Sequence, residues 1–201
     1  MGIQESDVTE DKKIDDEEIK FVSEKRPISQ QVALISILSA IGIAGSWAMV
    51  GLPNIEIITL TVFISGYVFG WKVGLIVGGI TEAIFSGFNP MGMAVLPVFI
   101  SQILSIMLVG FIGGLLGSRS ESTEINAWNI YQIVVIGASL TFFFDIFTTF
   151  THALVFTEMG GFIATFIFGI PFTIIHVASN SILFGTVPLP TTNKLRQFQF
   201  M

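Results

Sequence analysis

One apolar stretch in the middle of the chain decides the class of fold. Residues 92–117 read GMAVLPVFISQILSIMLVGFIGGLLG and contain no acidic or basic side chain. A helix of about 20 such residues crosses the hydrocarbon core of a bilayer. The whole 201-residue chain has the same character, because only 12% of its residues are charged. Soluble domains carry roughly 25% charged residues, so the sequence predicts an integral membrane protein.

The apolar residues divide into six spans. Residues 55–88 would form a helix about 50 Å long at 1.5 Å per residue, which is too long for one crossing. We therefore expect a hairpin at Gly70-Trp71-Lys72-Val73-Gly74. The predicted fold class is an all-α integral membrane protein with six transmembrane helices. Its spans are residues 28–50, 55–71, 73–88, 92–117, 129–155 and 161–187.

The basic residues predict the orientation in the membrane, because lysine and arginine accumulate in cytoplasmic segments. With six crossings, all nine basic residues fall on the side of the two termini. The loops near 51–54, 88–91 and 156–160 contain none. We therefore expect both termini to be cytoplasmic. The nine residues are Lys12, Lys13, Lys20, Lys25, Arg26, Lys72, Arg119, Lys194 and Arg196.

Three segments are predicted along the chain. Residues 1–27 hold nine of the 15 acidic and five of the nine basic residues, so we expect an acidic, largely disordered cytoplasmic tail. Residues 28–190 form the membrane domain, and residues 191–201 a short cytoplasmic tail. The acidic start does not resemble a signal peptide, so the first span is expected to be an uncleaved anchor in a multi-pass plasma-membrane protein.

Composition and motifs argue against several functions. The net charge of −6 and the lack of a concentrated basic surface argue against nucleic acid as a partner. The absence of cysteine excludes disulfides and thiolate metal sites. The sequence has no HExxH motif, no Ser-His-Asp arrangement and no Walker motif. We therefore expect neither an enzyme nor a bound metal or cofactor, and any ATP-driven step would come from another chain.

Ionisable side chains inside the spans mark the candidate site, because such a group in a bilayer usually faces a cavity or a partner. His176 and Asn180 share a helical face at the i, i+4 spacing. Asp145 shares a face with His152, seven positions on, and its depth favours a structural or partner-coupling role. Each polar residue could instead make a structural hydrogen bond between helices. An outward-facing polar pocket is suggested by Glu56, Glu82, Asn89, His152 and Glu158.

The first span also carries a face of small side chains, Ser36, Ala40, Ala44 and Ala48, at every fourth position. Small residues allow another helix to approach closely. That helix could belong to this chain's own bundle or to another protein. The glycines favour close packing inside the bundle, and they are Gly66, Gly70, Gly74, Gly78, Gly110, Gly113, Gly114 and Gly117.

Taken together, these features resemble the substrate-binding S components of energy-coupling factor (ECF) transporters, which are vitamin-uptake relatives of ABC importers. The resemblance covers about residues 28–190 and depends on the order and spacing of several segments. These are the six short spans, the Ala40 and Ala44 face, Pro53-Asn54-Ile55-Glu56, the glycine hairpin at 70–74, Phe88-Asn89-Pro90 followed by Gln102, and His176-Val177-Ala178-Ser179-Asn180.

The resemblance implies a high-affinity subunit that captures a vitamin or related micronutrient at the outer face for ATP-driven uptake by partner subunits. It implies that the small-residue face docks on a transmembrane T component, which sits on two cytoplasmic ATPases. In this family the ligand lies under the loop between spans one and two. The positions implied here are Asn54, Glu56, Glu82, Asn89, His152, Glu158, His176 and Asn180, with Trp47 and Phe88 as stacking surfaces.

The charge pattern restricts the ligand. The outer half holds no lysine or arginine, which a carboxylate or phosphate ligand would normally recruit. We expect a neutral or cationic ligand with a flat ring, such as a thiamine-like compound or a corrinoid. Two alternatives stay open: a stand-alone proton-coupled secondary transporter or channel using Glu82, Asp145 and His152, and an intramembrane enzyme using His152 or His176.

Overall fold

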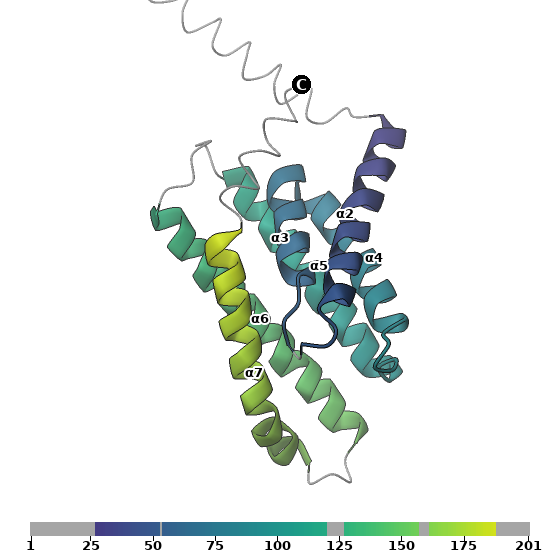
Figure 1. The fold of residues 1–201 in the computed structure, drawn as a ribbon, viewed down its shortest axis with the longest axis vertical. Helices are drawn as coiled ribbons and strands as arrows, with labels where there is room; N and C mark the ends of the chain where they lie inside the picture. Colours follow the sequence, from purple (N-terminus) through teal and green to yellow (C-terminus); the bar gives the residue numbers. More distant parts are fainter. Residues whose placement is uncertain (1–26, 53, 120–126, 157–160, 188–201) are drawn as a thin grey trace, which may run out of the picture. The chain divides into compact units, whose positions relative to one another are not determined.

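The structure, a computed structural model, describes residues 27–52, 54–119, 127–156 and 161–187. Within these ranges it contains helices and no strand (Figure 1). The chain divides into two units at Leu34 and Ile35, and the packing below is that of the second unit. The helices are α2 (Ile28–Ala48), α3 (Ile58–Phe69), α4 (Trp71–Gly87), α5 (Leu96–Arg119), α6 (Ala127–Val155) and α7 (Gly161–Thr186).

Four of these helices are long and apolar enough to cross a membrane, namely α2, α5, α6 and α7. The other two are shorter, since α3 has 12 residues and α4 has 17, against the about 20 needed for a crossing. The prediction of an all-helical fold is confirmed for the described residues. Four helices of spanning length are typical of a helical membrane protein, and the six predicted spans stay a prediction.

One clear difference from the predicted spans lies between α2 and α3. The first span was expected to reach residue 50 and the second to begin at 55, but α2 ends at Ala48 and α3 begins at Ile58. Asn54 has a φ of 58°, a left-handed conformation that Asn tolerates better than most residues. Such a residue cannot continue an α-helix. The connecting loop at 49–57, of which residues 49–52 and 54–57 are described, therefore replaces the predicted helix ends.

The predicted hairpin between the second and third spans is present but tighter than expected. Only Gly70 lies between α3 and α4, with a φ of 93°, which is readily accessible to glycine. A Cβ atom on Gly74 would lie 2.6 Å from the Cα atom of Gly66. The two helices therefore meet directly at glycine on both sides of the turn.

Glycines continue this close packing onto α5. A Cβ atom on Gly110 would lie 2.1 Å from the carbonyl oxygen of Gly74, and one on Gly113 would lie 2.4 Å from that of Phe63. No side chain fits at such distances, so α3, α4 and α5 are in backbone contact. The prediction that these glycines serve packing within the bundle is confirmed at the positions where α5 crosses α3 and α4.

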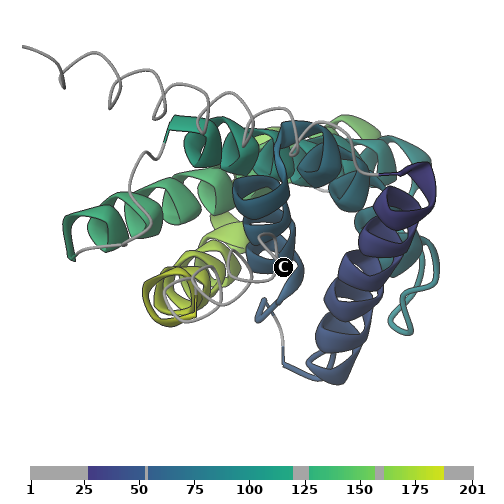
Figure 2. The same ribbon diagram turned by 90° about the horizontal axis from the view of Figure 1, so that it is seen from above.

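α3 is the central helix, since ten of its 12 residues are buried. Both views show it between α7 and the Ile35–Ala48 part of α2 (Figures 1 and 2). Its Phe63 ring lies 5.1 Å from the ring of Phe184 on α7. A helix that is apolar all round belongs in the interior of a bundle, and this position explains how so short a helix is held.

The helix directions alternate along the chain. The turn at Gly70, the end of α5, the start of α6 and the end of α7 therefore lie at the same end of the bundle (Figure 1). Lys72 and Arg119 are at this end. The predicted tails, apart from Pro27, and the candidate residue Glu158 lie outside the described residues.

Candidate functional site

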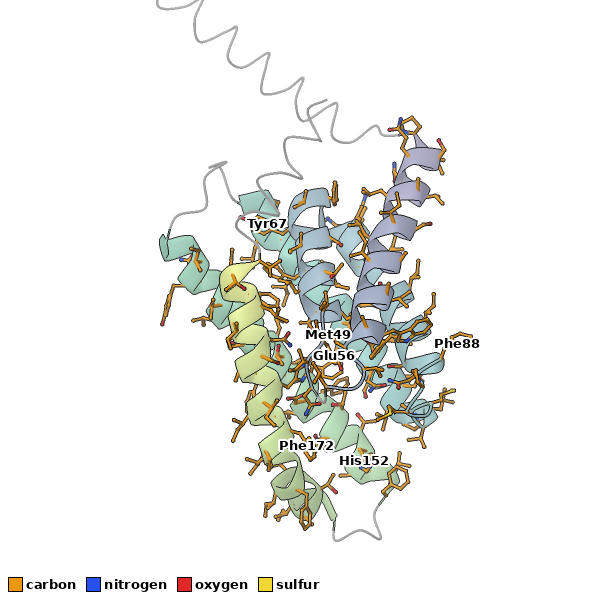
Figure 3. The ribbon with its side chains drawn as sticks, in the orientation of Figure 1. Met49, Glu56, Tyr67, Phe88, His152 and Phe172 are labelled. Carbon is orange, nitrogen blue, oxygen red and sulfur yellow. The ribbon has the colours of Figure 1, made fainter. Side chains whose placement is uncertain are left out.

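The loop at residues 49–57 is fixed to both neighbouring sides of the bundle. On the α7 side, Asn54 Nδ2 donates to the carbonyl oxygen of Phe172 at 3.1 Å, and Ser179 Oγ donates to the carbonyl oxygen of Asn54 at 2.8 Å. On the α2 side, the backbone N–H of Ile58 donates to Ser46 Oγ at 3.1 Å. These bonds hold Glu56, within the loop, in the centre of the bundle (Figure 3).

A buried imidazole–carboxylate pair joins α6 to α7. His176 Nδ1 lies 2.8 Å from Asp145 Oδ1, and the His176 side chain is 4% exposed. The carboxylate favours the tautomer with the proton on Nδ1. The ring of Phe144 packs edge-on against the imidazole, with ring centroids 5.8 Å apart, so the pair fixes the orientation of the ring.

Two further carboxyl groups interact with this pair. Glu56 interacts electrostatically with His176 and Asp145, and Glu82 on α4 interacts with Glu56 and His176. Glu82 is 2% exposed and accepts a hydrogen bond from Ser86 Oγ. The structure therefore brings together the polar cluster Glu56, Glu82, Asp145 and His176, with one member each from the loop, α4, α6 and α7.

Burial raises the pKa of the Glu56 carboxyl above its ordinary value of 4.5. The neighbouring His176 opposes this effect and Asp145 adds to it. Desolvation disfavours the charged form of a carboxyl group, so Glu56 holds its proton to higher pH than a free glutamate.

Asn180 lies one turn from His176 on the same face of α7, as the i, i+4 spacing predicted. It is fully buried, and its Nδ2 donates to Thr141 Oγ1 on α6 at 3.0 Å. This second bond between α6 and α7 is of the structural kind that the sequence also allowed.

Several buried polar atoms of this region have no hydrogen-bond partner among the described residues. They are Asp145 Oδ2, His176 Nε2, Asn180 Oδ1 and Thr81 Oγ1. An unpaired polar atom in an apolar interior costs free energy. Buried atoms of this kind are therefore where a polar ligand would find partners.

Phe88, Asn89 and His152 lie outside this cluster. Phe88 is 74% exposed and lies at the edge of the molecule, away from Glu56 (Figure 3). Asn89 Oδ1 accepts from the backbone N–H of Met91, which closes a local turn. The His152 ring packs on Phe156 at 4.5 Å, nearer the end of α6 than Glu56 (Figure 3). Trp47 is 39% exposed.

The cluster also includes a residue that the sequence analysis left out of the ligand set. Asp145 was paired with His152 by helical spacing and given a structural or coupling role, but its partner in the structure is His176. Spacing within one helix shows which residues share a face, and does not show which helix packs there. The signal in the sequence that could have added Asp145 to the ligand set is that it is the lone acid inside an apolar span.

The small-residue face of α2 points away from the bundle. Ser36, Ala40, Ala44 and Ala48 are all exposed, whereas Leu38, Ser39, Gly42 and Ser46 are buried. A Cβ atom on Gly42 would lie 2.9 Å from the methyl group of Thr81 on α4. Of the two packing alternatives left open by the sequence, the structure excludes packing of this face inside the chain's own described bundle.

Among the described residues, no group of three or more His, Asp or Glu side chains has the arrangement to hold a metal ion. No protein-family model, curated protein or solved structure matches the chain. The class that fold and site define is thus a helical membrane protein with a buried carboxyl–imidazole cluster.

Proposed function

We propose that this chain is the substrate-binding membrane subunit, or S component, of an ECF-type importer. It captures a vitamin or related micronutrient at the outer face of the plasma membrane, and partner subunits drive uptake with ATP. In this proposal the chain is a binding protein and not an enzyme. The observation that carries the proposal is the cluster of Glu56, Glu82, Asp145 and His176 in an otherwise apolar bundle, next to a loop that is fixed by hydrogen bonds.

Two features support binding over a purely structural role. Glu56 makes no hydrogen bond to the described residues and is half-buried, so its carboxyl group is available. His176 Nε2 and Asp145 Oδ2, both buried, also lack partners there. A cluster that served only to join helices would satisfy its own polar atoms.

The exposed small-residue face supports docking on another membrane protein, the T component. Lipid provides no hydrophobic drive for helix association, so close approach at Ala and Ser is what allows two helices to bind. The chain has no Walker motif of its own. Two ATPases bound to the T component therefore supply the energy in this proposal.

The six-span topology, with both termini cytoplasmic, is also a proposal. It is supported by the alternating helix directions and by Lys72 and Arg119 at one end of the bundle (Figure 1). It requires α3 and α4 to cross although they are shorter than a typical span. The loop at 49–57 precedes Ile58, the first residue of α3. Through its contacts with α2 and α7, it extends the protein beyond the start of α3.

Reconstitution tests the function. The chain is placed in liposomes alone, or together with a T component and two ATPases from the same genome, and uptake of radiolabelled thiamine, cobalamin, riboflavin and biotin is measured. We expect uptake of one of them only with the full complex and ATP. ATP-independent uptake by the chain alone would favour the proton-coupled carrier instead.

A further inference from the structure

The strongest unexplained feature of the cluster is its imbalance of charge and hydrogen-bonding groups. It combines three carboxyl groups with one imidazole. Within the described ranges the sequence holds one lysine, Lys72, and one arginine, Arg119. Lys72 is ten residues from Glu82 on α4, about 15 Å along the helix axis at 1.5 Å per residue, and Arg119 ends α5. The cluster has no cation of its own besides the imidazole.

The atoms left without partners are mostly acceptors. Asp145 Oδ2 and Asn180 Oδ1 are oxygens that accept, and both are buried. Glu56 adds a carboxyl group with no hydrogen bond to the described residues. In a neutral His176 ring whose Nδ1 proton faces Asp145, the unpaired Nε2 is an acceptor as well.

We propose that this cluster binds an organic cation that carries N–H donors, such as a protonated amine, an amidine or an aminopyrimidine. This inference rests on the proposed function and narrows its ligand, which the sequence alone left as neutral or cationic. The N–H groups of such a cation can donate to the unpaired acceptors, and hydrogen bonds between charged partners are the stronger kind. An anionic ligand would meet three carboxyl groups and no lysine or arginine.

The residues of the cluster have different roles in this proposal. Glu56 contacts the ligand, since it is the carboxyl group that lies in a loop and has no hydrogen bond to the described residues. Asp145 acts through His176 by holding the imidazole at 2.8 Å, so it is a positioning residue. Glu82 accepts a hydrogen bond from Ser86 and contributes a carboxyl group from α4.

Equilibrium binding to the purified full chain in nanodiscs tests the inference. The probes are thiamine, pyridoxamine and agmatine as cations with N–H donors, choline as a cation without them, biotin as an anion and riboflavin as a neutral ring compound. Binding is measured by titration calorimetry. We expect at least one N–H cation to bind, and choline, biotin and riboflavin to bind at least tenfold more weakly.

Variants connect that affinity to the cluster. Glu56→Gln keeps the shape of the side chain and removes its charge. The affinity for the cation should fall about tenfold or more, because a charge-assisted hydrogen bond is lost. Glu124→Gln, which removes a carboxyl group from the polar segment between the fourth and fifth spans, should leave the affinity unchanged. Thermal unfolding of both variants shows whether they fold. If Glu56→Gln does not fold, His176→Gln provides a second test of the same cluster.

Each outcome decides the inference. Preferential binding of biotin or riboflavin overturns the cationic ligand and leaves the binding-subunit proposal standing. Equal binding of choline and the N–H cations overturns the requirement for donors. Failure of all cations overturns the inference, and failure of every probe overturns the proposed function with it.

Discussion

At the scale of single residues, the pair of His176 and Asp145 explains why a charged group is tolerated inside an apolar bundle. An isolated charge in a low-dielectric interior is costly, and a hydrogen-bonded opposite partner offsets that cost. The 2.8 Å contact joins α6 to α7 and leaves one unpaired atom on each partner. The same two side chains therefore join the helices and still offer polar atoms to the proposed ligand.

The proposed binding of a cation should depend on pH through Glu56. Burial raises its pKa above 4.5, so below the raised value the carboxyl is protonated and does not attract a cation. Binding favours the ionised form, and affinity should therefore rise as the pH increases through that window. The increase is at most about tenfold per pH unit for one linked proton.

The groups around Glu56 act on this pH response. His176 on α7, Asp145 on α6 and Glu82 on α4 all interact electrostatically with Glu56. Dissociation constants measured between pH 5 and 8 check the prediction. The dependence should weaken in Glu56→Gln, and a dependence of the opposite sign would contradict it.

At the scale of elements, the glycine contacts of α3, α4 and α5 hold the core of the bundle. Gly74→Ala should destabilise the protein by about 1–3 kcal/mol, the usual cost of overpacking, because its Cβ would lie 2.4 Å from the carbonyl oxygen of Gly110. Gly51→Ala is the matched control, since its Cβ would meet nothing within 4 Å. Thermal unfolding in detergent compares the two, and equal stability would show that the close contact is not required.

The exposed face of α2 makes a separate prediction about assembly. Ala40→Trp places a large side chain on the small-residue face and should abolish co-purification with the T component, while ligand affinity stays unchanged. Ile167→Trp is the control, because Ile167 is 56% exposed and lies on another helix, α7. Survival of the complex in Ala40→Trp would show that docking uses another surface.

Much of this element-level organisation could be predicted from the sequence. Within the described residues, the apolar runs and glycines predicted the order of the helices and the turn at Gly70, and the spacing of small residues predicted the shared face on α2. The loop at residues 49–57 could not be predicted in length, since nothing in Met49-Val50 breaks a helix. The end of α2 follows from the hydrogen bonds of Ser46 and Asn54 with residues distant in the sequence.

The sequence predicted only part of the candidate site, because it does not show which helices pack together. Glu56, Glu82 and His176 were identified because a charge in an apolar span needs a partner. Their grouping with Asp145, and the separation of Phe88 and Asn89 from them, depends on how helices pack. That information is long-range and is not contained in spacing along one helix.

At the scale of the whole molecule, the number of crossings depends on whether the short helix α4 crosses. The chain has no cysteine, so single cysteines can be introduced directly at Lys72 and Met91, near its two ends. In intact cells an impermeant maleimide should label Met91→Cys, and should label Lys72→Cys only after permeabilisation. Labelling of both from the same side would show that α4 does not cross.

The central claim is that the buried cluster binds a small molecule, and its most direct test is mass spectrometry of compounds released from the purified chain. The measurement compares the unaltered protein with Glu56→Gln, both purified from cells grown in rich medium. We predict a nitrogen-containing cation that is enriched with the unaltered chain and lost with the variant. Equal amounts of the same compounds from both proteins would contradict the assignment of this cluster as the binding site.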